Sequence, residues 1–160
     1  NGNNFGSDIS FPSGASIAAG DVYVIVNSGL SLGCESEADY TNNTITGFNG
    51  NDAIGLAYNG VLIDALGEAG DDVGTAWDVA GVTHGMLDHT LVRNPTVNSG
   101  NAGDWTASAG TSESDSEWIV YDQNEWDYIG LHLCSVCGSG GDDPLLFIQS
   151  PSFINYPPIP

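Results

Sequence analysis

The chain of 160 residues is 41% hydrophobic and carries 21 Asp and Glu against one Arg and no Lys, which gives a formal net charge of -20. Its length and apolar content suit one domain with a core of its own. Because nucleic-acid binders need several Lys or Arg contacts to phosphate, these numbers exclude direct nucleic-acid binding and disfavour anionic membrane surfaces.

β-branched residues mark the first expected strand, from Asp21 to Asn27, after a start that is rich in Gly, Asn and Ser. Residues 28–43 are polar and predict a loop, and Thr44 to Phe48 is a second, shorter strand candidate. No stretch has the periodicity of an amphipathic helix. The pattern therefore predicts an all-β fold of short strands, arranged as an antiparallel sandwich.

The clearest local signal is Asn59-Gly60, which separates the apolar runs Ala53 to Tyr58 and Val61 to Leu66. A two-residue loop of this kind favours a type I′ hairpin and fixes the strand register. We expect Tyr58 opposite Val61, and beyond this pair Leu56 opposite Ile63 and Ile54 opposite Ala65. These five side chains would form the core face: Ile54, Leu56, Tyr58, Val61 and Ile63. The other face would carry Gly55, Ala57, Leu62 and Asp64.

Three further strand candidates follow, at Trp77 to Ala80, His89 to Arg93 and Glu117 to Tyr121. The composition changes at Cys137, so we expect a β-sandwich domain over residues 1–137 and a flexible Gly/Asp linker over residues 138–143. Residues 144–160 are then an extended β-like tail or the start of a second domain. The apolar run in this segment has no turn that links it to a partner strand, and it consists of Leu145, Leu146, Phe147, Ile148 and Gln149.

Arg93 is the only Arg in the chain, which contains no Lys. The alternation of a strand predicts that Arg93 shares a face with Leu91 and ends its strand at a sheet rim. We expect its guanidinium to meet a Trp face or an acidic loop and to act as a structural clamp.

Four tryptophans are candidates for the core or for a sugar-stacking surface. Trp118 lies in an apolar strand and is expected to be buried, and Trp77 is expected to be structural. Trp105, between Asp104 and Thr106, is the better candidate for an exposed aromatic, so carbohydrate binding depends on Trp105 or Trp126.

The three cysteines, Cys34, Cys134 and Cys137, are too few for a zinc site or a disulfide-rich scaffold. We expect one disulfide, from Cys34 to Cys134 or Cys137, in an oxidising exterior. A redox pair of Cys134 and Cys137 is the alternative, although the segment lacks the strand-to-helix setting of such motifs.

The sequence contains no machinery for acyl or phosphoryl transfer, so we expect no enzymatic activity. His84 and His89 are spaced for neither a helix face nor a strand face and are expected to be ordinary loop and strand-edge residues. Calcium is the one cofactor that the acidic loops suggest, through hard oxygen ligands. The candidate ligands are Glu68, Asp71, Asp72, Asp122 and Asp127.

Several segments in order resemble the lamin-tail domain family, as found in secreted bacterial nucleases and surface proteins. They are AAGDVYVIVNS, GNDAIGLAYNGVLIDALG, GTAWDVAG, DHTLVRNP, SGNAGDWTASAGTSESDSEWIVY and NEWDYIGLHLC, which together cover Asp21 to about His132. The resemblance implies an immunoglobulin-like β-sandwich that binds or tethers and has no active site of its own. Members open with strands that would precede Asn1, so these strands are expected to have been removed, to be absent from this relative or to be supplied by another chain.

These observations together predict a secreted or cell-surface structural module that acts through protein contacts, including contacts with copies of itself. A sandwich without its opening strands would have an unpaired edge, and residues 145–149 of a neighbouring copy could add to it. The alternatives are an accessory domain of a secreted nuclease and a carbohydrate-binding module. No apolar run approaches the roughly 20 residues of a membrane span, so we expect no membrane insertion.

Overall fold

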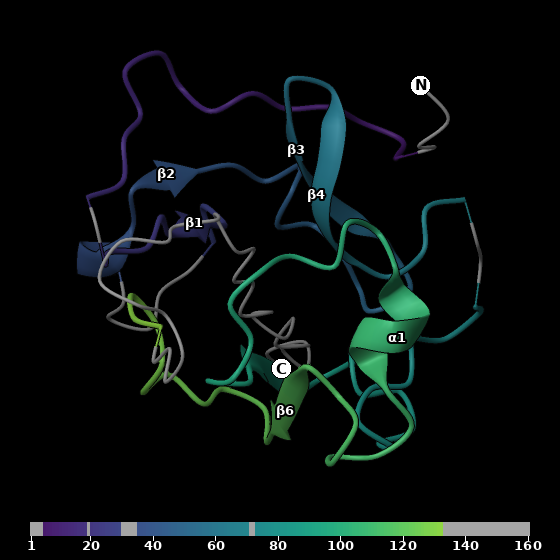
Figure 1. The fold of residues 1–160 in the computed structure, drawn as a ribbon. Helices are drawn as coiled ribbons and strands as arrows, with labels where there is room; N and C mark the ends of the chain where they lie inside the picture. The colour runs from purple at the N-terminus through teal and green to yellow at the C-terminus, as the bar shows by residue number, and fades with distance from the viewer. Residues whose placement is uncertain (1–4, 19, 30–34, 71–72, 133–160) are drawn as a thin grey trace, which may run out of the picture.

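The computed structural model describes residues 5–18, 20–29, 35–70 and 73–132, and it is an all-β protein with little helix (Figure 1). The elements are, in order, β1 (Ile25–Val26), η1 (Glu35–Glu37), β2 (Tyr40–Thr41), β3 (Ile54–Tyr58), β4 (Val61–Leu66), β5 (Thr90–Arg93), α1 (Trp105–Ala109) and β6 (Trp118–Tyr121). Among these residues no helix is long and apolar enough to cross a membrane.

The strands form three separate two-stranded sheets in the described part of the chain. β1 and β2 are parallel, whereas β3 with β4 and β5 with β6 are antiparallel. The expected strands at His89 to Arg93 and Glu117 to Tyr121 are confirmed as β5 and β6, which pair Arg93 with Trp118 and Thr90 with Tyr121. The all-β class predicted from the sequence is thus confirmed.

Two expected strands are wrong. Residues 43–46 form a turn, because the Asn42 side-chain oxygen accepts hydrogen bonds from the backbone of Thr44 and Ile45 at 3.0 and 3.1 Å. Around Val79 only an isolated bridge to Val82 forms, since Ala80 has a φ of 53° and turns the chain back at once. Local side-chain bonding and a tight turn therefore replace extended structure at both places.

The β3–β4 hairpin turns at Asn59 and Gly60, whose φ values of 49° and 78° are those that the type I′ prediction requires. Tyr58 pairs with Val61 as expected, but the register then shifts, and Leu56 pairs with Asp64 and not with Ile63. β4 thus has one extra residue, a β-bulge. From the bulge onward, each β4 side chain points to the face of the sheet opposite to the one expected.

The bulge overturns the predicted core face. Tyr58 and Val61 are 69% and 64% exposed at the tip of the hairpin, whereas Asp64, expected on the outer face, is fully buried. Ile54 and Leu66, which pair at the base of the hairpin, are the residues that enter the core. The hairpin is therefore buried only at its base.

A loop closes the outer edge of β4. The Ala102 N–H donates to the Ile63 carbonyl at 3.0 Å, next to the bulge. The Asn101 side chain both accepts from the Ala65 N–H at 3.0 Å and donates to the Ala65 carbonyl at 2.8 Å. One amide side chain thus makes the two hydrogen bonds that a neighbouring strand would make.

α1 was not predicted from the sequence. Asp104 begins it by accepting a hydrogen bond from the Ala107 N–H at 3.1 Å, as an N-cap residue does. Trp105 and Ala109 face the interior from this single turn. The capping residue was a usable signal, but five helical residues are too few to show a periodicity.

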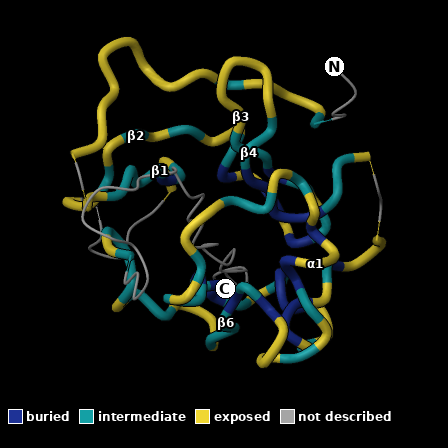
Figure 2. Tube along the Cα trace, in the orientation of Figure 1, coloured by how far each residue is buried: buried dark blue, intermediate teal, exposed yellow. Residues whose placement is uncertain are grey.

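The core lies between the base of the β3–β4 hairpin, α1 and the β5–β6 pair, where Figure 2 shows the buried segments. Three tryptophans pack at its centre, with ring centroids 6.4 Å apart for Trp77 and Trp105 and 6.3 Å apart for Trp105 and Trp118. The other buried members are Phe48, Ile54, Leu66, Val79, Ala80, Met86, Leu91 and Ala109. Cys34, Cys134, Cys137, the linker and residues 144–160 lie outside the described residues.

We predict that Asn101→Ala lowers the free energy of unfolding by about 1–3 kcal/mol, because it removes both hydrogen bonds that the Asn101 side chain makes to the Ala65 backbone. Urea denaturation followed by tryptophan fluorescence measures the change. Asn98→Ala, an exposed position in the same loop, is the matched control and should have almost no effect. Equal effects of the two substitutions would contradict the role given to Asn101.

Candidate functional site

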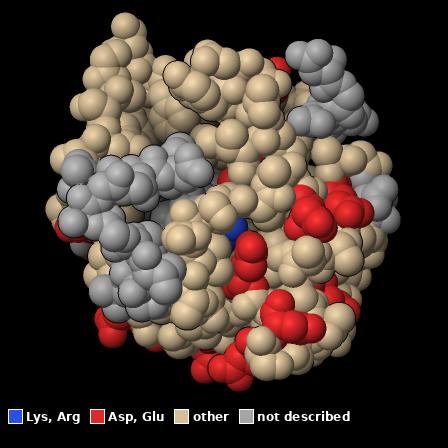
Figure 3. All heavy atoms as spheres, in the orientation of Figure 1, with Lys and Arg blue, Asp and Glu red and all other residues tan. Residues whose placement is uncertain are grey.

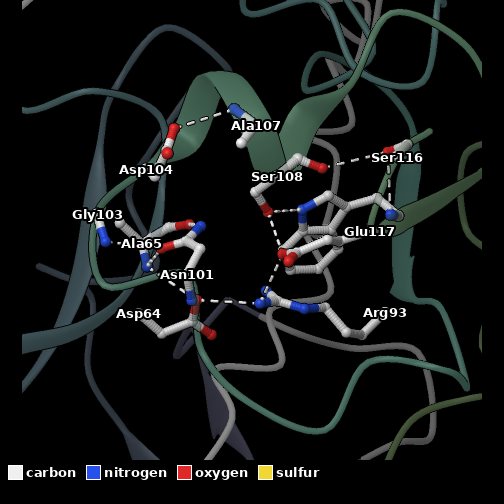
Figure 4. A network of polar contacts seen from close by, with 11 residues as sticks. Asp64, Ala65, Arg93, Asn101, Gly103, Asp104, Ala107, Ser108, Ser116 and Glu117 are labelled. Carbon is white, nitrogen blue, oxygen red and sulfur yellow. Dashed lines mark hydrogen bonds and ion pairs between the residues drawn. The ribbon is translucent and has the colours of Figure 1, made fainter.

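The most extensive polar cluster that the structure describes surrounds Arg93, which is 1% exposed (Figure 4). Its Nη2 lies 3.1 Å from Asp64 Oδ1 and 3.0 Å from Glu117 Oε2. The guanidinium carbon is 4.4 Å from the centre of the Trp118 ring. Both kinds of partner expected from the sequence thus contact Arg93, but they lie inside the molecule and not at a sheet rim.

Ser108 of α1 extends this cluster. Its hydroxyl donates to Glu117 Oε2 at 2.5 Å and accepts from Trp118 Nε1 at 3.0 Å. The backbone N–H of Glu117 donates to the Ser108 carbonyl at 2.9 Å. A single serine therefore fixes both the carboxylate and the indole that contact Arg93.

Asp64 connects the same cluster to β4 and to the loop after β5. Its Oδ1 accepts from the Asn101 N–H at 2.9 Å and from its own neighbour, the Ala65 N–H, at 3.1 Å. A buried carboxylate is tolerated only when it is paired and hydrogen-bonded, and Asp64 meets both conditions. The Arg93 cluster, defined as Asp64, Arg93, Ser108, Glu117 and Trp118, thereby joins β4, β5, α1 and β6.

Access to the Arg93 cluster is restricted, because the Asp64 and Arg93 side chains are fully buried and only Glu117 reaches solvent, with 31% of its side chain exposed. Arg93 Nε and Nη1 have no hydrogen-bond partner among the described residues, so the Trp118 face supplies part of the compensation for the buried charge. This arrangement suits a group that holds four elements together.

The three histidines occupy different places. His84 is exposed in a turn with a φ of 58°, and the His89 ring nitrogen Nδ1 lies 2.7 Å from the Leu87 carbonyl. Burial lowers the pKa of His132, and the charge of Arg93 lowers it further. In residues 5–132, excluding the three gaps, no group of three or more His, Cys, Asp or Glu side chains is close enough to hold a metal.

The calcium candidates that the structure describes do not form a group that could hold a metal. Glu68 accepts a hydrogen bond from Thr106 at 3.2 Å, and Asp122 and Asp127 are exposed in loops. Asp71 and Asp72 lie outside the described residues.

The expectation that Trp105 is an exposed aromatic is wrong. Trp105 is 2% exposed, because α1 places it against Trp77 and Trp118. The expected burial of Trp118 is confirmed, since it is fully buried. Trp126, the other residue on which carbohydrate stacking depended, is partly buried.

The surface carries charge of one sign. The one Arg is only 1% exposed, and Figure 3 shows acidic side chains over the middle and lower parts of the face in view. From Ile54 to Ile63 the β3–β4 hairpin contains no charged residue. Tyr58 and Val61, which lie opposite each other at its tip, are the two most exposed large hydrophobic residues in the part of the chain that the structure describes.

Sequence reasoning missed this hairpin tip, because it placed Tyr58 and Val61 in the core. The Asn59-Gly60 turn between them was the available signal, since turns lie at the surface and their flanking pair is the least buried of a hairpin. Comparisons of the chain with protein-family models, with curated proteins and with solved structures gave no match.

We predict that Arg93→Ala lowers the free energy of unfolding by about 3–5 kcal/mol, because it leaves the Asp64 carboxylate buried without its cation. Chemical denaturation followed by tryptophan fluorescence measures the loss. A double variant, Arg93→Met with Asp64→Leu, removes both charges and should recover part of it. Arg93→Ala with unchanged stability would contradict the structural role of the cluster.

We also predict an acid-dependent contribution from Asp115. Hydrogen bonds from the Thr111 and Ser112 side chains, together with their backbone N–H groups, lower the pKa of Asp115 from 3.8 to about 2. A carboxyl with a depressed pKa stabilises the fold above its unfolded value, and that stability is lost as the pH falls toward 2. Asp115→Asn should therefore lower Tm at neutral pH, and the gap to the wild type should narrow below about pH 4.

Circular dichroism melting curves across this pH range measure the effect. Asp122→Asn, which changes another exposed loop carboxylate, is the control for general charge effects. A gap between wild type and Asp115→Asn that stays constant with pH would contradict the prediction.

Proposed function

We propose that this chain is a non-catalytic structural and binding module that acts through protein contacts, including contacts with copies of itself. The observation that carries the proposal is the exposed, uncharged tip of the β3–β4 hairpin, with Tyr58 and Val61 opposite each other. Tyr is enriched in protein interfaces, and an apolar patch within a charged surface is typical of an interaction site.

The resemblance of the ordered segments to lamin-tail domains supports the same function, and it is the basis for proposing an immunoglobulin-like sandwich architecture. The hairpin and the strand that ends in Arg93 are two of the segments that carry this resemblance. A secreted or cell-surface location is part of the proposal and rests on the same resemblance.

The charge of the chain sets a condition on self-association. Two copies of formal charge -20 repel each other. At physiological ionic strength, dissolved salt screens the repulsion between charges that are more than about 8 Å apart. An uncharged contact surface avoids placing carboxylates against carboxylates. The proposal therefore expects stronger association as salt is added.

We predict that the protein self-associates as its concentration rises from about 1 μM to about 1 mM, and that added salt strengthens the association. Light scattering coupled to size-exclusion chromatography, with sedimentation velocity, measures the particle mass. Tyr58→Ser with Val61→Ser should weaken the association by about tenfold or more.

The matched control is Ile17→Ser, which removes another hydrophobic side chain of similar exposure, 52%, from a different part of the surface. It should leave the association unchanged. A monodisperse monomer at every concentration and salt level would contradict self-association as part of the function.

A further inference from the structure

The outer edge of β3 is an unpaired strand edge among the described residues. Residues Ile54–Tyr58 hydrogen-bond to β4 on one side, and in the described part of the chain no other backbone pairs with them. The strand is Ile-Gly-Leu-Ala-Tyr, without a charge or a proline. Proteins commonly protect an exposed edge with charged residues, proline or a bulge, and β3 has none of these.

The other edge of the same hairpin is protected. Asn101 and Ala102 occupy the hydrogen-bonding groups of Ala65 and Ile63, and the bulge lies on β4. The β4 edge of the hairpin is therefore closed to an added strand, whereas the β3 edge can accept one.

The remaining strands are less suited to receive a partner. Every residue of β5 and β6 is buried or half-buried, and β1 and β2 have two residues each. β3, in contrast, becomes progressively exposed toward its end, where Ala57 and Tyr58 are open to solvent. The open edge is therefore continuous with the exposed hairpin tip.

The chain itself contains a segment of matching chemistry. All 21 acidic residues lie before Pro144, and the 17 residues from Pro144 to Pro160 carry no charged side chain. This segment can approach another copy without the like-charge repulsion that opposes contact between two acidic surfaces. Its apolar run, Leu145 to Gln149, has the same length as β3.

The intervening chain is long enough to reach a neighbour. Twelve residues separate His132, the last described residue, from Leu145. At about 3.3–3.6 Å per residue, they span up to roughly 40 Å when extended. This length exceeds the distance across a typical small domain, about 30 Å.

We propose that the outer edge of β3 receives Leu145 to Gln149 of a second copy as an added strand. Main-chain hydrogen bonds to β3 supply the affinity in this mode, and alternate side chains supply the specificity. The donor segment and the acceptor edge differ, so the contact is head-to-tail and builds closed rings or open chains of copies. The inference rests on the proposed function and names the partner and the surface that carry it out.

Two substitutions separate acceptor from donor. In a two-residue hairpin the pair that flanks the turn, here Tyr58 and Val61, is hydrogen-bonded. Hydrogen-bonded and non-hydrogen-bonded pairs alternate along an antiparallel ladder, so the N–H of Ala57, in the next pair, points away from β4. Ala57→Pro removes this outward N–H and leaves the pairing with β4 intact, and Ala57→Ser, which keeps the N–H, is its matched control. Phe147→Asp places a charge in the donor run.

The test uses the full-length chain and compares particle masses by light scattering and sedimentation. Ala57→Pro and Phe147→Asp should each reduce association by about tenfold or more, whereas Ala57→Ser should behave as the wild type. Melting curves and tryptophan fluorescence check that each variant is folded. When the two defective variants are mixed, the intact donor of one should bind the intact acceptor of the other and form a two-chain complex.

Three outcomes would overturn the inference. If the wild type associates and neither substitution weakens the association, the copies associate through a surface other than the β3 edge. If each variant is monomeric and their mixture remains so, donor and acceptor are not these two segments. If the wild type is monomeric and Phe147→Asp accelerates hydrogen exchange of the β3 amides, the segment docks on its own chain.

Discussion

The arrangement of the core depends on the buried pairing of Arg93 with Asp64 and Glu117. Moving a guanidinium and a carboxylate out of water costs several kcal/mol per ion, and their attraction offsets this cost only when the geometry is good and other hydrogen bonds are made. Those hydrogen bonds come from Asn101 and Ser108, which belong to the loop after β5 and to α1. A shift of any one element would leave a buried charge uncompensated, so the cluster specifies how these elements are placed relative to one another.

The sequence predicted the features that depend on local residues. The Asn59-Gly60 turn, the strands that became β5 and β6 and the burial of Trp118 all follow from residues within a few positions of each other. The bulge at Ile63 could not be predicted in this way, because it accompanies a hydrogen bond from Ala102, which lies 39 positions away. Asp64 became a partner of Arg93, and Trp105 entered the core, through similarly distant contacts.

The candidate interaction surface illustrates the same limit. Tyr58 and Val61 are residue types typical of a core, and their place at the tip of the hairpin, which no described segment covers, makes them surface residues. The difference between the edges of β3 and β4 likewise depends on Asn101, a residue whose sequence context of Gly, Asn and Ser suggests only a loop. Side-chain hydrogen bonds to a strand edge have no sequence periodicity and appear only once the chain is folded.

The burial of the only Arg in a chain without Lys has a consequence for proteolysis. Trypsin and related proteases cleave after Arg or Lys, so the bond between Arg93 and Asn94 is the only one that they can attack. In the folded protein this bond belongs to the end of β5, and the Arg93 side chain cannot enter a protease pocket while it is enclosed. Cleavage must wait for an opening that releases Arg93, so its rate reports the equilibrium of that opening when closing is fast. The burial of this one guanidinium thus protects the folded chain from proteases that cleave after Arg or Lys.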